Sequence, residues 1–125
     1  MMEILDLLGL ADVADVPAGS LSYGKQKNLE IARAVATHPK LLLLDEPASG
    51  LNTQELDELS HRISVIRDRG ISVILIEHKM DVVMSISHKI MVLNFGKKIA
   101  FGTPDEIRND PVVIEAYLGK EDEDE

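Results

Sequence analysis

Apolar residues recur along the chain in two patterns, one typical of helices and one typical of buried strands. Helical spacing, with an apolar residue every three or four positions, occurs within residues 3–10, 22–37 and 53–70. Residues 41–44 (LLLL) and 71–76 (ISVILI) are instead apolar at successive positions, as in parallel strands that are covered on both faces. The sequence therefore predicts two buried strands that alternate with amphipathic helices.

Residues with strong positional preferences mark where these helices begin and end. Ser22 is the predicted N-cap of the second helix, which Pro39 stops because the residue before a proline disfavours the helical conformation. Asn52 or Thr53 is the predicted N-cap of the third helix. Residues 12–19, between the first and second helices, are predicted to form a loop.

The C-terminal third of the chain predicts shorter elements. A short helix is expected around residues 80–84, followed by strands at 89–93 and 97–101 that form a hairpin. Two further helices begin at prolines that follow the capping residues Thr103 and Asp110. This order of elements predicts an α/β fold in which a mostly parallel sheet has flanking helices and is edged by the terminal β-hairpin.

Composition supports one globular domain. A chain of 125 residues can bury a core, and 45% hydrophobic with only 3% aromatic residues predicts an aliphatic one. No apolar run reaches the ~18 residues of a membrane-spanning helix, no signal-peptide pattern begins the chain, and no cysteine is present, so we expect a soluble protein without disulfides. The formal charge of −9 argues against a nucleic-acid surface, and residues 120–125 are expected to form a disordered acidic tail.

Both predicted strands end in residues that are able to do chemistry. Asp45 and Glu46 follow the first strand, and Glu77 and His78 follow the second. Because ligands of open parallel sheets bind at the carboxyl ends of the strands, this coincidence favours a functional site over surface positions. Two adjacent acids would suit a Mg²⁺ ligand beside a group that activates water, although acids that merely cap a strand before Pro47 are the plainer alternative.

One phosphate-binding motif is nearly present. Residues 19–26 fit G-x-x-x-x-G-K but continue with Gln26, where a P-loop needs the Mg²⁺-binding hydroxyl of serine or threonine. The preceding residues are also too polar for the buried strand from which a P-loop emerges. We therefore reject a P-loop here, and no other segment of the sequence matches that motif.

The same segment has a better interpretation. Residues 21–25 (LSYGK) open a helix with exposed backbone, a possible anion site, shortly before the four-leucine strand. Together with the strand-end acids, this arrangement resembles the signature loop and Walker B strand of ATP-binding subunits of ABC transporters, within the P-loop NTPase fold. Four further stretches are similar to the ATPases of branched-chain amino acid importers: residues 29–33, 96–100, 102–104 and 113–119.

The resemblance implies a site for ATP and Mg²⁺. Asp45 would hold Mg²⁺ through water, Glu46 would be the catalytic glutamate that polarises the attacking water, and His78 would be the switch histidine at the γ-phosphate. A lone histidine at a strand end is otherwise a surface residue, but the run Ile-Glu-His-Lys-Met (residues 76–80) favours the functional role.

Two further segments would act across a dimer. Four residues correspond to the signature that contacts the ATP of a second ATPase subunit: Ser22, Tyr23, Gly24 and Lys25. Four residues correspond to the D-loop: Ser49, Gly50, Leu51 and Asn52. A turn followed by a helix cap explains the same four residues equally well. Lys25 and Asn52 differ from the common Gln and Asp. The resemblance implies that two such subunits form a homodimer or heterodimer and bind permease subunits in the membrane, so the protein would lie at the cytoplasmic face of the membrane. A periplasmic or extracellular substrate-binding protein would be an indirect partner.

The resemblance covers residues 1–119 and corresponds to the C-terminal portion of the ATP-binding domain. The adenine-binding aromatic residue, the P-loop and the glutamine loop of the family are not found before Leu21. A fragment, a truncated reading frame and one part of a split protein all explain this. Two functions compete. The first is the ATPase part of a transporter, which could import branched-chain amino acids or urea or could serve lipopolysaccharide export. The second is a non-catalytic module that docks on intact ATPases. DNA-repair relatives are disfavoured because no long heptad segment occurs.

Overall fold

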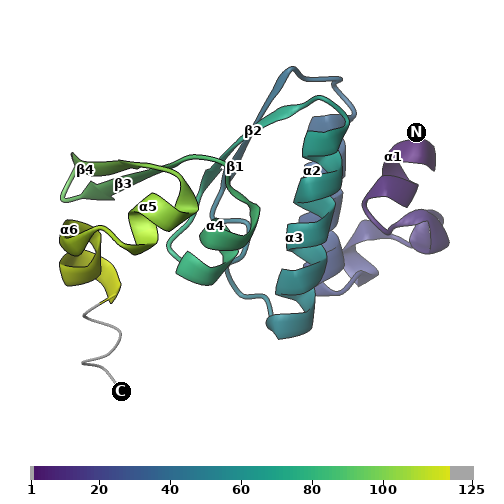
Figure 1. Ribbon diagram of the computed structural model, residues 1–125. Helices are drawn as coiled ribbons and strands as arrows, with labels where there is room; N and C mark the ends of the chain where they lie inside the picture. Colours follow the sequence, from purple (N-terminus) through teal and green to yellow (C-terminus); the bar gives the residue numbers. More distant parts are fainter. Residues whose placement is uncertain (1, 119–125) are drawn as a thin grey trace. The chain divides into compact units, whose positions relative to one another are not determined.

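The computed structural model describes residues 2–118 and contains two compact units, Met1–Val82 and Val83–Glu125 (Figure 1). Each unit combines helices with a two-stranded sheet, so the predicted α/β fold class is confirmed. The predicted acidic tail, residues 120–125, lies outside the described residues. Within the described part of the chain, no helix is both long enough and apolar enough to cross a membrane.

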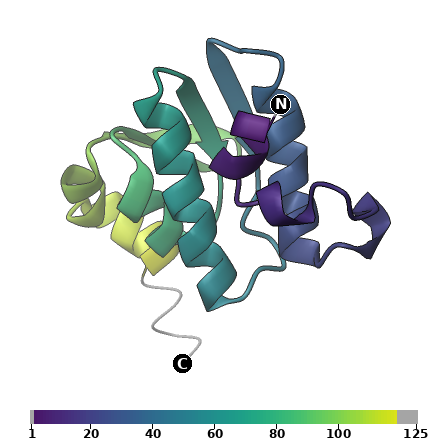
Figure 2. The same cartoon turned by 90° about the vertical axis from the view of Figure 1, so that its right-hand side faces the viewer.

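The first unit contains two parallel strands and the helices that cover them. Its elements are α1 (Met2–Leu7), α2 (Tyr23–Val35), β1 (Leu41–Asp45), α3 (Thr53–Asp68) and β2 (Ser72–Ile76). The predicted loop at residues 12–19 overlaps two 3₁₀ turns, Ala11–Val13 and Ala18–Ser20. Figure 2 shows α2 and α3 along the same face of β1 and β2, and α1 contacts both helices. A short helix, α4 (Met80–Ile86), includes the boundary between the units.

The helix starts follow the sequence closely, whereas two helix ends do not: α1, predicted over residues 3–10, ends at Leu7. Ser22 caps α2, since its Oγ accepts from Lys25 N at 3.3 Å. Asn52 rather than Thr53 caps α3, in a reciprocal capping box with Glu55. The prediction that α2 runs to residue 37 was wrong: the helix ends at Val35, and two short-range hydrogen bonds close its last turn before the chain reaches Pro39.

The strands β1 and β2 pair in parallel from Leu41↔Ser72 to Asp45↔Ile76. The prediction that both strands are covered on both faces was wrong. Leu42 and Leu44 are 4% and 8% exposed, whereas Leu43 is 66% exposed. Alternate residues of a strand point to opposite faces, and the helices of this unit cover only one of them. The uncovered face carries Leu41, Leu43, Ile74 and Ile76.

The core of the first unit lies between the covered face of the sheet and the helices. The buried side chains come from the segment after α1, from α2 and from α3: Leu8, Leu10, Ile31, Ala32, Val35, Leu59, Ile63 and Ile66. Arg62 Nη1 also donates to Leu7 O at 2.9 Å, which links α3 to the end of α1. The helices thus hold the sheet, and with it the strand ends, from one side.

The second unit is built around the predicted hairpin. Strands β3 (Ile90–Asn94) and β4 (Lys97–Gly102) pair antiparallel, with an irregularity between Val92 and Leu93. Phe95 and Gly96 form the connection, both with positive φ. The expectation that the hairpin edges the parallel sheet was wrong: among the described residues it forms a separate two-stranded sheet.

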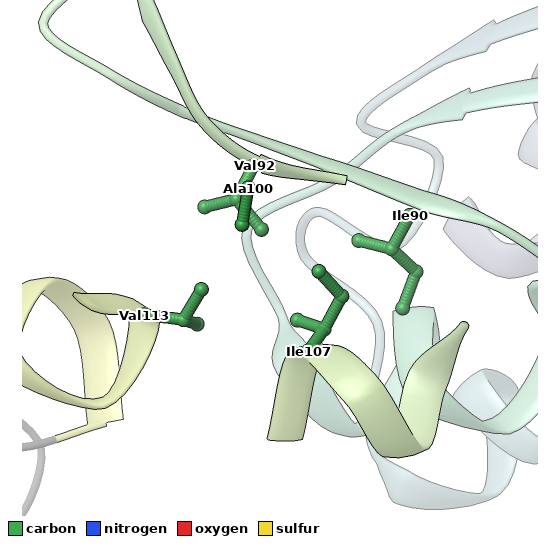
Figure 3. Close-up of a cluster of buried hydrophobic side chains, with 5 residues drawn as sticks. All are labelled: Ile90, Val92, Ala100, Ile107 and Val113. Atoms are coloured by element: carbon green, nitrogen blue, oxygen red, sulfur yellow. The ribbon is translucent and has the colours of Figure 1, made fainter. Parts of the chain in front are cut away.

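Short capped helices close the core of the second unit. They are α5 (Pro104–Arg108), α6 (Pro111–Val113) and a π-helical turn, η3 (Ile114–Leu118). Figure 3 shows the core side chains that the hairpin and helices contribute, which are Ile90, Val92, Ala100, Ile107 and Val113. Tyr117 Oη donates to Leu93 O. In the cap of α5, hydrogen bonds from the backbone and the side chain of Thr103 lower the pKa of Glu106 below its ordinary value.

Candidate functional site

The carboxyl ends of β1 and β2 lie at one edge of the parallel sheet. Asp45 pairs with Ile76, and Glu46 N donates to Ile76 O at 2.8 Å, so the ladder continues one residue beyond β1. Glu77 and His78 directly follow β2. The parallel register therefore brings all four ionisable residues of the two strand ends to one place, as expected for a binding edge.

Glu46 and His78 are in direct contact, although they are 32 positions apart in the chain. Glu46 Oε1 lies 3.0 Å from His78 Nδ1, and the two side chains are 53% and 65% exposed, so both are open to a ligand. Because an ionised carboxylate only accepts, Nδ1 carries the proton in this contact, which leaves Nε2 of a neutral ring as an acceptor. The structure thus brings the predicted catalytic glutamate and the predicted switch histidine into direct contact.

The backbone of Glu46 is unusual. Its φ of +48° lies in the left-handed region, which residues with a Cβ rarely adopt. Strained conformations of this kind concentrate at functional sites, where the surrounding structure holds them. Here Glu46 N is fixed by Ile76, and Glu46 O accepts from Ser49 N at 3.3 Å. Hydrogen bonds at both its backbone N–H and its backbone C=O therefore hold the strained residue in place.

Asp45 is the exposed last residue of β1. The described residues contain no group of three or more His, Cys, Asp or Glu side chains that could hold a metal ion. A nucleotide-bound Mg²⁺ needs less from the protein, because phosphate oxygens and water supply most of its ligands and one or two carboxylates complete them. As a single exposed carboxylate, Asp45 fits that requirement in its predicted role of holding Mg²⁺ through water.

Glu77 has a position that sequence reasoning did not assign. Its side chain is fully buried. Oε2 accepts from Ala48 N at 3.1 Å, and Oε1 accepts from His78 N at 3.0 Å. The available signal was an acid placed directly after an apolar strand, but the sequence alone does not show that this acid turns inward.

The predicted D-loop is a turn that leads into α3. Gly50 has a φ of +78°, Leu51 is buried, and Asn52 caps α3 with its side chain. Ser49 and Gly50 are exposed. The plainer interpretation of these residues, a turn with a helix cap, is confirmed for Asn52, and the role of the segment toward a second subunit stays a prediction.

The predicted signature segment packs against that turn. A Cβ on Gly50 would lie 2.8 Å from Cε1 of Tyr23, so the ring of Tyr23 covers this glycine. Gly24 is buried, and a Cβ there would lie 2.0 Å from Oε2 of Glu55. Ser22 and Tyr23 are exposed at the first turn of α2, where free backbone N–H groups favour an anion. Tyr23 and Gly50 therefore join the two predicted interface segments.

Lys25 and Gln26 have local roles in the structure. Lys25 Nζ lies 3.7 Å from Asp12 Oδ2, an exposed ion pair. Gln26 Nε2 donates to Leu21 O at 3.2 Å and to Ala18 O at 3.4 Å. Gln26 thus holds the turn that precedes α2, which explains an amide at this position without any nucleotide contact.

Comparison with known proteins finds matches to ABC transporter sequences along the chain. A family model described as ABC transporter matches residues 1–49, and one described as branched-chain amino acid ATP-binding cassette transporter matches residues 97–123. The high-affinity branched-chain amino acid transport ATP-binding protein BraF of Pseudomonas aeruginosa is 50% identical over 117 residues, which are 93% of this chain and 46% of BraF. LivG of Salmonella typhimurium, described in the same words, has the same identity and coverage.

A solved structure extends the similarity to the fold. The ADP conformation of an ATP-binding cassette of an ABC transporter has a TM-score of 0.85 and 33% identity, and the match covers 94% of this chain and 48% of that one. The chain thus spans about half the length of the relatives it matches. On these matches, the chain is similar over nearly its whole length to one half of ABC transporter ATP-binding proteins.

Proposed function

We propose that this chain supplies the catalytic edge of an ATP-hydrolysing subunit of an ABC importer for branched-chain amino acids. The observation that carries the proposal is the 3.0 Å contact between Glu46 and His78 at the carboxyl ends of two parallel strands. The substrate class rests on the names of BraF and LivG and on the match of residues 97–123.

Each residue of the edge has a proposed role. Glu46 polarises and deprotonates a water molecule, and His78 orients Glu46 through Nδ1 while the rest of its exposed ring faces the phosphate. Asp45 holds Mg²⁺, which when bound neutralises phosphate charge. The first turn of α2, with Ser22 and Gly24, faces a nucleotide held by a second ATPase subunit, and Ser49 and Gly50 lie at the same interface.

The proposed partners follow from these roles. Because signature residues contact a nucleotide that another subunit holds, the composite site needs a second ATPase subunit whose P-loop binds that nucleotide. Permease subunits in the membrane and, through them, an external substrate-binding protein complete the importer. This assembly places the chain at the cytoplasmic face of the membrane.

We expect the 125-residue chain by itself to hydrolyse no ATP above background. Phosphate binding in this fold depends on P-loop amides and a lysine, which the sequence does not contain. Robust turnover by the purified chain that is lost in Glu46→Gln would contradict this expectation. A second candidate function is a non-catalytic module that docks on intact ATPases through the exposed signature residues Ser22 and Tyr23.

The test uses the chain completed, by fusion or co-expression, with the N-terminal half of a related ATPase. Glu46→Gln keeps the size and hydrogen bonding of the side chain but removes its negative charge. ATP should still bind, while hydrolysis falls on the order of 10²–10⁴-fold, the worth of a positioned general base. The mutant should accumulate as an ATP-bound dimer, which size-exclusion chromatography with labelled ATP would detect.

Ser22→Arg separates the two candidate functions. It should block closure of the dimer and leave ATP bound to an open monomer, because the arginine occupies the place of the opposing phosphate. Mixed with a copy that lacks a working P-loop, it should restore at most one of the two composite sites. Normal dimerisation and turnover in Ser22→Arg would remove the proposed signature. A completed protein that never hydrolyses ATP, but whose chain inhibits an intact ATPase, would favour the docking module.

A further inference from the structure

Glu77 connects the two loops that carry the candidate site. It stands between β2 and His78 in sequence, yet its Oε2 reaches Ala48 N, 29 positions earlier, at 3.1 Å. Ala48 has no exposed surface and lies between Pro47 and the exposed Ser49 of the predicted interface turn. One side chain thus holds the loop after β1 and the loop after β2 at a fixed separation.

The contacts of Glu77 require a carboxylate. Both oxygens accept from backbone N–H groups, Oε1 from His78 N at 3.0 Å and Oε2 from Ala48 N. A glutamine has one oxygen and one amide nitrogen, and the nitrogen is a donor only, so it could satisfy just one of the two N–H groups. An aspartate is one methylene shorter and could not reach both loops.

The side chain is also poorly placed for chemistry of its own. It is fully buried, in contrast to the half-exposed Glu46 and His78. Its nearest ring contact is Oε1 to His78 Nδ1 at 3.5 Å, longer than the 3.0 Å from that nitrogen to Glu46. A buried charged group is costly unless it is hydrogen-bonded, and both oxygens of Glu77 are used by backbone donors, which indicates a positional role.

We infer that Glu77 is a positioning residue: its carboxylate fixes His78 relative to Glu46 and couples this pair to the interface turn at Ser49 and Gly50. The inference rests on the proposed function for its consequence in hydrolysis, but the link between the loops stands on the contacts alone. A shift of the turn, such as one caused by a second subunit, is therefore transmitted to His78 through one side chain.

The first experiment measures the link in the 125-residue chain itself. Amide hydrogen exchange and ¹⁵N–¹H shifts of Ala48 and His78 are compared in wild type, Glu77→Gln and Glu77→Ala. Glu77→Ala should speed exchange at both amides, whereas the isosteric Glu77→Gln should keep one protected and release the other. Glu58→Ala, an exposed glutamate on α3, is the matched control. Unchanged exchange at both amides in Glu77→Ala would overturn the inference.

The second experiment measures the consequence in the completed ATPase. Glu77→Ala should lower kcat about 10- to 100-fold, the range expected for a small misplacement of a reacting group, with KM for ATP little changed. In a His78→Ala background the same substitution should have a much smaller effect, because Glu77 acts on hydrolysis mainly through His78. Additive losses would show a merely structural role and overturn the inference. Full hydrolysis in Glu46→Gln would instead remove the proposed function and leave the exchange result to decide the link.

Discussion

The two units each contain one two-stranded sheet, but the strands are joined in opposite ways. In the first unit β1 and β2 run parallel and are connected through α3, so residues 32 positions apart meet at one edge. In the second unit β3 and β4 run antiparallel and are connected by Phe95 and Gly96. Every residue that we place in the candidate site belongs to the first unit.

This difference shows what non-local pairing contributes. A hairpin places only its own neighbours together, and its register is set by its turn. A parallel pair needs a crossover, which leaves two independent loops at the same end of the strands. Glu46 from one loop and His78 from the other can then share a hydrogen bond, while Glu77 fixes the distance between the loops.

The largest expected effect on stability lies in the second unit, whose core is small and closed. Ile107 is 1% exposed and belongs to a cluster of five buried residues. Ile107→Ala should lower the free energy of unfolding of this unit by about 2–5 kcal/mol, because it leaves a cavity. Urea unfolding of the chain measures the change. Leu43→Ala on the uncovered face of β1, where the side chain is 66% exposed, should cost less than about 0.5 kcal/mol.

If Ile107→Ala and Leu43→Ala lowered the free energy of unfolding equally, the contrast between the closed core of the second unit and the uncovered strand face of the first would be wrong. They would mean that in solution the uncovered face of β1 and β2 is buried, for instance between two copies of the chain. Apolar strand faces of this kind favour association, and a concentration-dependent midpoint for wild type that Leu43→Ala removes would identify it.

A matched pair of glycines gives a smaller effect and tests the contact between the signature segment and the interface turn. Gly50 in the first unit and Gly96 in the second have φ of +78° and +76°. An alanine at either position should cost about 1–2 kcal/mol for the left-handed conformation. At Gly96 nothing lies within 4 Å of the added Cβ, whereas at Gly50 the ring of Tyr23 lies 2.8 Å away.

Gly50→Ala should therefore cost about 1 kcal/mol more than Gly96→Ala, as overpacking does. In a Tyr23→Ala background the excess should vanish, which a double-mutant cycle on the free energy of unfolding would show. An excess that persists without Tyr23 would mean that the ring does not carry the contact.

The sequence predicted the local features of both units well. Ser22, Asn52, Thr103 and Asp110 act as helix caps because capping depends on residues within one turn. The hairpin was predicted for the same reason. The burial of β1 and β2 was not, since successive apolar residues show that a strand can be buried on both faces but not which partners cover it.

The residues of the candidate site were named from the sequence and stay a prediction, whereas the geometry between them came only from the structure. Placing Asp45, Glu46 and His78 at strand ends needed only the strand boundaries and the family resemblance. The inward position of Glu77, the packing of Tyr23 on Gly50 and the contact of Glu55 with Gly24 depend on how α2, α3 and the sheet pack, which no local pattern encodes. Glu46 and Glu77, the glutamates that follow β1 and β2, thus differ in burial for reasons that lie elsewhere in the chain.

The smallest predicted effect concerns Glu106 in the second unit, whose carboxylate binds a residue three positions earlier, whereas Glu77 in the first unit binds Ala48, 29 positions earlier. Glu106 accepts from the backbone and the hydroxyl of Thr103, three positions earlier, and these bonds lower its pKa below the ordinary 4.5. A lowered pKa in the folded state gives stability that is fully present above the unfolded value and is lost as pH falls below it. Opening of α5, followed by amide exchange at Ile107, should therefore become easier below about pH 4.5.

Thr103→Ala should raise the pKa of Glu106 toward its ordinary value and weaken this dependence, whereas Thr103→Ser keeps the hydroxyl and should preserve it. Carboxyl-carbon NMR titration of the three proteins measures the shift, and an unchanged Glu106 titration in Thr103→Ala would show that the backbone bond alone holds this carboxylate.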